Sequence, residues 1–499
     1  MSVPHLIWFK RDLRLQDHPA LQAASKEAAS IFCFYVFEPS LLEDPHYETR
    51  HFRFIVQSLE DLSQRLGAFG HKLWVFWTEI EPLLQAFKQD FGQFRLFSHE
   101  EIGLAKSFQR DLRVKQWCQQ QGILWLEFPQ FAVQRGTQGR CGWRRFADQF
   151  FAQPLAQVDL SQLRPTHLVP EAQAQNYLCR ALPKSWLQKP ASFQAGGETA
   201  AWQRVDQFFR HHLCHYAHHI SQPEASLQSC SRLSPYLAWG NLSLRQLLKK
   251  LNRQAHSHHR SALESRLRWH CHFVQKFESD CRMEFEPLNP AFIPLLAQAR
   301  AERIRSETAD FEAWSQGQTG YPLVDACMRA LLDTGYLNFR MRAMLVSVAC
   351  HHLQLDWKAV AEHLARCFLD FEPGIHYPQI QMQAGLTGFN TLRIYNPLQQ
   401  SLKQDAQAHF IQRYLPELKE LPLPLQHQPW LITPLEALMY KSHDSTGCSN
   451  TYPEFYPQRC FDHLLTGKAA RERLWQWKSL PQVKAYLPQL LHNQVSQDD

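Results

Sequence analysis

The sequence lacks an uninterrupted apolar stretch that could cross a membrane. Hydrophobic residues make up 44% of its 499 positions, but charged, amide or histidine side chains interrupt every run before the roughly 18 residues that a bilayer requires. The first segment, MSVPHLIWFKRDLRLQD, does not combine a basic region, a long apolar core and a small-residue cleavage site. We therefore expect a soluble, cytoplasmic protein without a membrane partner.

The 13 cysteines lack the spacing of a disulfide framework or a metal cluster. Their number is odd, and most lie in apolar helical patterns, where cysteine behaves as a small hydrophobic residue. Reduced thiols are the expected state. Cys448 and Cys460 lie twelve residues apart near the C-terminus, but no C-x-x-C motif accompanies them, which argues against an iron-sulfur cluster.

Charge and length set only broad limits. The formal net charge of +6 suits contact with a polyanion but also suits many ordinary enzymes. The length of 499 residues exceeds what one hydrophobic core usually organises, so we expect two or three domains.

The first 130 residues alternate short apolar runs with amphipathic helical patterns. The apolar runs are HLIWF, IFCFYVF, KLWVFW, FRLFS and ILWLEF, and the clearest helical patterns cover Thr49 to Leu66 and Ile102 to Gln120. This alternation predicts a Rossmann-like α/β domain over residues 1–130, with a parallel sheet and right-handed crossovers.

The remaining chain divides into a connector and a helical part. Residues 131–197 are rich in Pro and Gln without a sustained period, which predicts a long surface connector. Residues 198–499 predict an all-α domain, with helix starts at Ser243, Asp310 and Thr319 and a helix end at Gly335. After Leu421 the helical pattern weakens, and we expect the polar tail VSQDD to fray.

Two arginines lie in an apolar helical pattern within the segment Trp314 to Met344. A buried arginine is costly unless it meets an acid or a ligand, so Arg340 and Arg342 need partners. Asp370 and Glu372 follow an apolar helix and are available. A structural ion pair and a carboxylate that tunes a cofactor ring both remain open.

Several motifs in one order resemble the DNA photolyase and cryptochrome family. They are WFKRDLRLQDHPAL near the N-terminus, CSRLSPYLAWGNLS from Cys230, GQTGYPLVDACMR followed by TGYLNFRMR, then RIYNP and FIQRYLPEL. The match covers nearly the whole chain. It implies that the all-α domain buries a U-shaped FAD and that the protein is a monomer that acts on UV-damaged DNA.

The resemblance also implies which residues hold the FAD. The CSRLS segment would face the pyrophosphate at the start of a helix, where anions bind well, and His376 would face flavin N5. Arg342, Asp370 and Glu372 would lie beside the isoalloxazine. The implied cofactor-binding set is Tyr216, Cys230, Ser231, Arg232, Leu233, Ser234, Arg342, Asp370 and Glu372.

The implied substrate positions depart from the family pattern. Trp269 matches a lesion-stacking tryptophan, and Arg340 would hold a phosphate or a lesion carbonyl at the cavity mouth. Arg266 replaces the glutamate of enzymes that act on cyclobutane dimers. Phe339 and Ala343 replace an asparagine and a methionine of that site, and they also replace the two histidines of six-four enzymes.

Because the FAD residues match the family and the substrate positions do not, three candidate functions remain. We favour light-driven, FAD-dependent repair of pyrimidine dimers, of the cyclobutane type, by electron transfer from reduced flavin. The alternative is a cryptochrome-type blue-light receptor, although the long C-terminal extension of many such receptors is missing. The third possibility is a light-independent nucleic-acid-binding protein. It would need only the net positive charge and would not retain the flavin contacts.

The electron-transfer chain and the antenna site of the family are only partly matched. Trp357 corresponds to the middle tryptophan, Tyr377 stands near the flavin-proximal position, and Ile304 occupies the surface position. Glu100 and Glu101 come slightly too early to match the glutamate that marks folate binding. A folate or deazaflavin antenna therefore stays undetermined.

Histidines concentrate in RHHLCHYAHHI, residues 210–220, and again at 256–259. His215 and His219 have the i, i+4 spacing of a metal-binding pair. Surface or polar core histidines are the favoured interpretation, so we predict no metal site.

Overall fold

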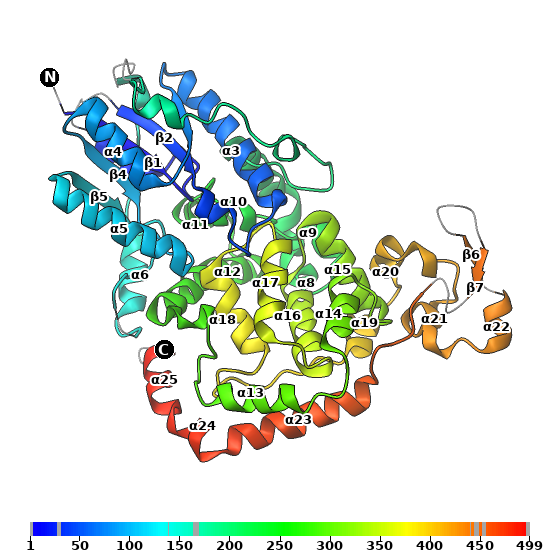
Figure 1. Cartoon of the computed structure of the whole chain (residues 1–499). Coiled ribbons are helices and arrows are strands. Elements are labelled where there is room, and N and C mark those ends of the chain that lie inside the picture. Colours follow the sequence, from blue (N-terminus) through cyan, green and yellow to red (C-terminus); the bar gives the residue numbers. More distant parts are fainter. Residues whose placement is uncertain are drawn as a thin grey trace.

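The computed structural model describes residues 3–26, 31–137, 139–162, 169–439, 441–443, 449–451 and 456–495. An α/β unit at the N-terminal end packs against a larger group of helices, which Figure 1 shows in green to red. This arrangement confirms the predicted fold class. Among the described residues, none of the helices combines the length and the apolar character that a membrane span needs.

The α/β unit contains a five-stranded parallel sheet in the order β3-β2-β1-β4-β5. All five apolar runs of the sequence form its strands, which confirms that prediction. The winding direction reverses between β1 and β4, and the crevice at the carboxyl ends of such strands is a common ligand site. The strands are β1 His5–Phe9, β2 Ile31–Phe37, β3 Leu73–Trp77, β4 Arg95–His99 and β5 Leu124–Phe128.

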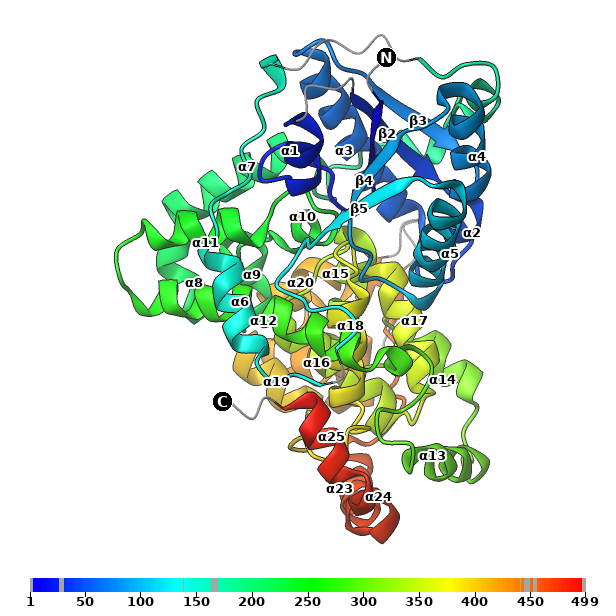
Figure 2. The same cartoon turned by 90° about the vertical axis from the view of Figure 1, so that its left-hand side faces the viewer.

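Helices cover both faces of this sheet (Figure 2). The two helices predicted in this region exist, with ends shifted by a few residues. The first of them buries apolar side chains such as Phe54 and Leu62 on its inner side. The helices are α1 Pro19–Ser25, α2 Pro39–Leu42, α3 Thr49–Gly67, α4 Ile80–Phe91 and α5 Ala105–Gln121.

The connector carries more structure than its composition predicts. It contains α6 (Trp143–Ala152), and short 3₁₀ turns follow at Leu160–Gln162, Ala174–Tyr177 and Lys184–Trp186. Trp186 stacks on Phe52 of α3 with ring centroids 4.4 Å apart. Such aromatic contacts attach the connector to the sheet unit. The Pro- and Gln-rich composition of the connector does not predict them.

The helical part surrounds the long helix α12, which packs closely against α18. Leu263, Leu267 and Val274 supply the buried side of α12. The helices up to the C-terminal region are α7 Glu198–Gln207, α8 Tyr216–His219, α9 Pro223–Ser229, α10 Ser234–Ala238, α11 Leu244–Asn252, α12 His258–Ser279, α13 Phe292–Ala301, α14 Glu307–Ser315, α15 Pro322–Thr334, α16 Phe339–Ser347, α17 Trp357–Cys367, α18 Pro373–Gln383, α19 Pro397–Gln404 and α20 His409–Tyr414.

Of the three predicted helix starts and one predicted helix end, one start and the end are confirmed. Ser243 caps α11 by accepting a hydrogen bond from the Gln246 N–H, and Gly335 ends α15 in the left-handed conformation. The other two predictions are wrong. Asp310 lies inside α14, which Ser306 caps, because Arg303 and Arg305 bind the Asp310 carboxylate instead.

Thr319 also does not begin a helix, since α15 starts three residues later at Pro322. The Asp325 carboxylate accepts hydrogen bonds from the Thr319 N–H, the Thr319 hydroxyl and the Gly320 N–H. A carboxylate inside the helix therefore organises the preceding turn, where the sequence suggested a hydroxyl cap.

The prediction that helical structure weakens after Leu421 is wrong. Five helices follow in the described residues, of which α23 and α24 run along the base of the helical group and α25 turns upward at its left edge (Figure 1). Residues 496–499 of the VSQDD tail lie outside the described residues. The elements are α21 Leu423–His427, α22 Pro434–Met439, the antiparallel strands β6 Lys441–His443 and β7 Ser449–Thr451, α23 His463–Ser479, α24 Pro481–Ala485 and α25 Leu487–Gln494.

Candidate functional site

A cavity of about 310 Å³ lies among α8, α10, α12, α16 and α18. Apolar side chains such as Leu267, Val346 and Phe368 form much of its wall. Cavities of this size and character are typical binding sites for small molecules and cofactors.

The structure brings most of the predicted site residues to this cavity. Three of the predicted positions, Arg340, Trp357 and Tyr377, do not line it. The predicted residues that line it are Tyr216, Cys230, Ser231, Arg232, Leu233, Ser234, Arg266, Trp269, Arg342, Asp370, Glu372 and His376.

The CSRLS segment turns sharply between α9 and α10 along one wall. Arg232 has a positive φ of 56°, which is uncommon for a residue with a side chain and marks a constrained turn. Arg204 of α7 holds this turn by donating to the Ser231 carbonyl at 2.9 Å and the Gln228 carbonyl at 3.1 Å. Sequence reasoning missed Arg204, because its contact with the turn comes from tertiary packing.

Arg342 and Asp370 form an ion pair in the cavity wall. Two hydrogen bonds of 3.0 and 2.9 Å join the guanidinium to the carboxylate, and Arg342 Nε donates to the Leu337 carbonyl at 2.7 Å. Burial alone would raise the pKa of Asp370, but the Arg342 guanidinium holds that pKa below its ordinary value. Asp370 is therefore an anion at neutral pH, and the Arg342 cation balances its charge in the cavity wall.

Glu372 has a different environment at the start of α18. Its side chain is buried, and burial raises its pKa to about 7, although Arg11 opposes this effect. Arg11 comes from the loop after β1 and donates to the carbonyls of Ala238 at 3.0 Å and Phe371 at 2.6 Å. The sheet unit thus places a cation next to Glu372. Sequence reasoning missed Arg11, although it lies inside the motif WFKRDLRLQDHPAL.

Aromatic side chains stand exposed at the cavity mouth. Trp269 of α12 is 45% exposed and Phe339 of α16 is 41% exposed. The Arg266 guanidinium lies 4.2 Å from the centre of the Trp269 ring. Arg340 lies outside the cavity lining, and its buried Nε has no partner among the described residues.

Four buried polar atoms of the cavity wall have no hydrogen-bond partner in the described part of the chain. They are His270 Nδ1, Asn338 Oδ1, Gln379 Oε1 and Gln383 Oε1. Each such atom costs about 1–3 kcal/mol if it stays unpaired, so the wall is built for a polar ligand. Burial lowers the pKa of His270 to about 3, so its ring is neutral.

His376 also presents a neutral ring to the cavity. Burial lowers its pKa to about 3, and its Nε2 bonds to the Ala361 carbonyl at 2.9 Å. Because a carbonyl only accepts, Nε2 carries the proton and Nδ1 has a free lone pair. His376 therefore offers an acceptor.

Comparison with known proteins identifies the two parts of the chain. Residues 5–133 match the model described as DNA photolyase, and residues 263–476 match the model described as FAD binding domain of DNA photolyase. This chain belongs to the DNA photolyase and cryptochrome family. The second match includes the α12, α16 and α18 walls of the cavity, so the helical part is the family's FAD-binding domain.

Relatives in this family carry two kinds of name. A deoxyribodipyrimidine photo-lyase from Alkalihalophilus pseudofirmus is 26% identical over 93% of this chain and 96% of its own length. A cryptochrome DASH from Synechocystis is 29% identical over 86% of this chain and 91% of its own length. The structure of a class III photolyase from Agrobacterium tumefaciens superposes with a TM-score of 0.79 at 23% identity, covering 96% of this chain and 98% of that chain.

The cavity wall fits the FAD that this family binds. FAD has a ring N–H, an amino group and hydroxyl groups that can donate to the partnerless oxygens of Asn338, Gln379 and Gln383. Its pyrophosphate can accept hydrogen bonds from N–H groups of the 230–234 turn. The apolar parts of the wall suit the flat isoalloxazine and adenine rings. The Arg342–Asp370 pair places two opposite charges in fixed positions beside this space.

The positions that the resemblance assigns to electron transfer lie outside the cavity lining. Trp357 and Tyr377 are buried, whereas Ile304 is fully exposed and has no aromatic ring. Trp314 is fully buried, and its indole N–H donates to the Leu345 carbonyl at 3.2 Å. Trp314 therefore belongs to the core.

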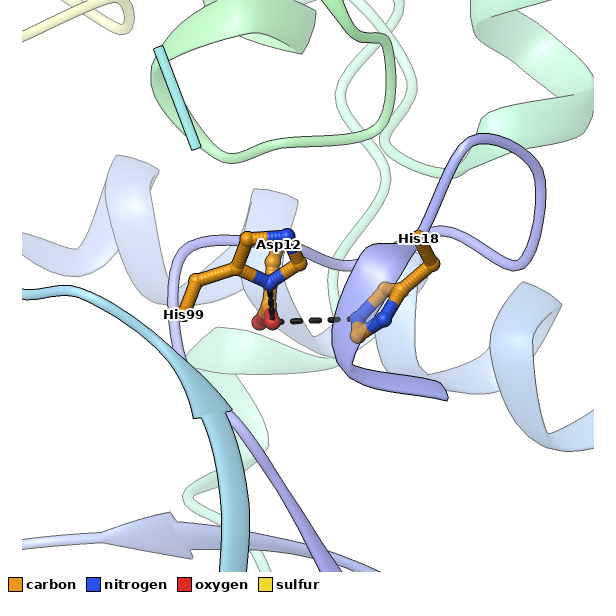
Figure 3. A group of neighbouring side chains, drawn as sticks. All are labelled: Asp12, His18 and His99. Atoms are coloured by element: carbon orange, nitrogen blue, oxygen red, sulfur yellow. Dashed lines mark hydrogen bonds and ion pairs between the residues drawn. The ribbon is translucent and has the colours of Figure 1, made fainter. Parts of the chain in front are cut away.

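A buried group of Asp12, His18 and His99 lies at the carboxyl ends of β1 and β4 (Figure 3). The Asp12 carboxylate is 2.6 Å from His99 Nδ1 and 3.0 Å from His18 Nε2. However, His18 Nδ1 accepts the Leu21 N–H at 3.0 Å, so Nε2 carries the ring proton and has no lone pair for a metal. The group serves as a hydrogen-bonded link between β1, α1 and β4.

The other metal and antenna candidates also have structural partners. His215 and His219 stack with ring planes only 12° apart, and His219 Nδ1 bonds to the Ser229 hydroxyl at 2.9 Å. Glu101 accepts hydrogen bonds from Arg110 and from backbone N–H groups. Cys448 lies outside the described residues, so its relation to Cys460 is not described.

Proposed function

We propose that this protein is a light-driven DNA photolyase that repairs pyrimidine dimers, of the cyclobutane type, as a monomer acting on UV-damaged DNA. The observation that carries this proposal is that Trp269 and Phe339 present exposed rings at the cavity that the Arg342–Asp370 pair also lines. A protein that only stored a flavin would have no need to expose two aromatic rings there.

Several groups in the wall support the FAD part of the proposal. The turn at residues 230–234 would hold the pyrophosphate through backbone N–H groups and hydroxyls, with Tyr216 beside it. Arg342, Asp370 and the His376 lone pair would orient the isoalloxazine and set its protonation. When bound, reduced FAD supplies the light-excited electron that splits the dimer.

The rim would recognise the lesion after it leaves the DNA stack. Flipping a nucleotide costs a few kcal/mol and least for a damaged pair, and stacking on Trp269 would return about 1–3 kcal/mol per base. Arg266 stands beside Trp269 as a cation in place of an acid. It would therefore pair with a phosphate or a pyrimidine carbonyl.

The second candidate is a cryptochrome-type photoreceptor. Arg266, Phe339 and Ala343 replace residues of the cyclobutane-dimer site, and one relative is named cryptochrome DASH. The two candidates differ in what the reduced protein does under blue light. Loss of dimers from irradiated DNA supports a photolyase, whereas flavin photochemistry without dimer loss supports the photoreceptor.

A further inference from the structure

We propose that Tyr377 is a redox-active tyrosine that donates an electron to the photoexcited flavin while His46 takes its proton and Asp44 stabilises the resulting cation. The three side chains form a hydrogen-bonded triad between the sheet unit and the FAD-binding domain. This inference rests on the proposed FAD site. It does not depend on DNA repair.

Tyr377 lies directly behind the cavity wall on α18. Its side chain is 2% exposed, and its ring contacts the ring of His376, which lines the cavity, with centroids 5.6 Å apart. On its other side it stacks on Phe277 at 6.0 Å with planes 17° apart. Tyr377 is therefore in ring contact with a residue of the cavity wall.

The hydrogen bonds around Tyr377 run in one direction. Tyr377 Oη bonds to His46 Nε2, and His46 Nδ1 lies 2.6 Å from Asp44 Oδ1. Because the Asp44 carboxylate only accepts, His46 Nδ1 carries the ring proton and Nε2 accepts the phenolic proton. Catalytic triads use the same order of carboxylate, imidazole and hydroxyl to take a proton from the hydroxyl.

Burial makes this proton acceptor necessary. Burial raises the pKa of Tyr377, so the phenol stays protonated until it is oxidised. An oxidised phenol that kept its proton would be a buried cation without a counter-ion, which is costly. The hydrogen bonds from His46 hold the pKa of Asp44 below its ordinary value despite burial, so Asp44 is an anion next to His46.

Charged groups from neighbouring elements leave the surroundings mainly negative. Glu284 and Glu362 act on Tyr377 from a 3₁₀ turn and from α17, and they raise its pKa further after burial. Lys106 of α5 lies 4.0 Å from Asp44, on the solvent side, and is 46% exposed. Asp44 and Lys106 connect the triad to the surface.

The step balances in electrons and protons. One electron leaves Tyr377 and reduces the flavin by one electron, and the phenolic proton moves to His46 Nε2. Tyr377 becomes a neutral radical and His46 an imidazolium. The thiolate form of an added thiol then returns an electron to Tyr377 and becomes a thiyl radical, and two such radicals couple to a disulfide. The proton moves back from His46 to Tyr377, and the flavin stays reduced by one electron.

Such a route would compensate for the aliphatic residue at the surface end of the family's aromatic chain. Ile304 is fully exposed there and cannot carry an electron hole. The triad instead keeps the hole close to the flavin and moves only a proton outward.

The test is photoreduction of the flavin-loaded protein with a thiol, combined with electron paramagnetic resonance. We expect a tyrosyl signal in the wild type that changes when ring-deuterated tyrosine is incorporated. Tyr377→Phe should lose the signal, and His46→Gln should slow photoreduction by about 10²-fold, the low end for a positioned proton acceptor. Tyr321→Phe, which changes another buried tyrosine outside the cavity lining, is the matched control and should keep the signal.

Three results would overturn this inference. They are a radical on an indole, an unchanged tyrosyl signal in Tyr377→Phe, or wild-type photoreduction in both Tyr377→Phe and His46→Gln at equal FAD content. Chemical reduction with dithionite bypasses Tyr377, so dimer repair by the prereduced Tyr377→Phe variant should equal that of the wild type. Failure of repair in both prereduced proteins would contradict the proposed photolyase and leave the radical result as the test of Tyr377.

Discussion

The Arg342 guanidinium donates two hydrogen bonds to the Asp370 carboxylate, from Nη1 to Oδ1 at 3.0 Å and from Nη2 to Oδ2 at 2.9 Å. This paired geometry fixes the orientation of the carboxylate as well as its position. The pair joins the helix that carries the exposed Phe339 to the segment that begins α18. It therefore connects the cavity mouth to the wall beside the proposed flavin ring.

Asp370→Asn should weaken FAD binding and alter the flavin absorption spectrum, because it removes the charge and keeps the shape. We also expect a loss of about 2 kcal/mol in the free energy of unfolding. This is less than the ~3–5 kcal/mol for breaking a fully buried pair, because the Arg342 side chain is 25% exposed. FAD content, spectra and denaturant unfolding provide the measurements.

Asp333→Asn is the matched control, since it makes the same change on the exposed side of α15. It should leave FAD content and stability unchanged. Wild-type flavin spectra and FAD content in Asp370→Asn would contradict the assignment of this pair to the flavin site.

Trp269→Ala should weaken binding of dimer-containing DNA by about tenfold or more, because base stacking on an aromatic ring contributes about 1–3 kcal/mol. FAD content should not change. Fluorescence anisotropy with a labelled oligonucleotide measures the effect, and Trp475→Ala, an exposed tryptophan on α23 away from the cavity lining, serves as control. Equal dissociation constants for the two variants would remove Trp269 from the lesion site.

Arg266→Ala should lower the salt dependence of DNA binding. If Arg266 contacts one phosphate, the slope of log K against log salt concentration falls by about 1. Arg268→Ala is a close control, because Arg268 lies on the same helix but binds Asp148 of α6 at 2.7 Å. A slope that changes equally in both variants would mean that only general charge matters.

Glu372 should make the stability of the protein fall between about pH 4.5 and 7. Its pKa is raised to about 7 in the folded chain, so the folded state holds the proton more tightly than the unfolded state. This contribution is fully present below the ordinary pKa of about 4.5 and is lost as the pH rises through 7, with a total of about 3 kcal/mol. Glu372→Gln removes it.

Denaturant unfolding of the wild type and Glu372→Gln at several pH values gives the required difference. Contributions of other buried acids, such as Asp325, are present in both proteins and cancel in that difference. We expect the variant to gain stability relative to the wild type between pH 5 and 8. A difference that is the same at every pH would contradict the raised pKa of Glu372.

The sequence predicted the sheet well because its strands are short apolar runs between turns, and the central strand β1 is fully buried. It also indicated that Arg342 needs an acid, since a buried arginine is too costly without one. The acid lies 28 residues away along the chain. The apolar pattern around Arg342 nevertheless predicted that this arginine has an acidic partner.

The residues that were missed, and the helix start that was wrongly predicted, depend on contacts between distant parts of the chain. A local sequence pattern does not contain such contacts. Arg11 reaches Phe371 across 360 residues, and Arg204 reaches the 230–234 turn from another helix. Asp310 resembles a helix cap, but two arginines bind its carboxylate. The sequence did not predict helix α23, because this helix exposes Leu464, Leu465 and Trp475 and so shows no single apolar face.

The most direct test of the proposed function is repair of a defined cyclobutane dimer under blue light. The flavin-loaded protein, reduced without oxygen, is mixed with a single-stranded or duplex oligonucleotide that contains one dimer, and restored pyrimidines are counted against a dark control and Trp269→Ala. We predict light-dependent repair by the wild type that is reduced in the variant. Dimers that stay intact in both substrates, while the flavin responds to light, would contradict a photolyase and support the photoreceptor.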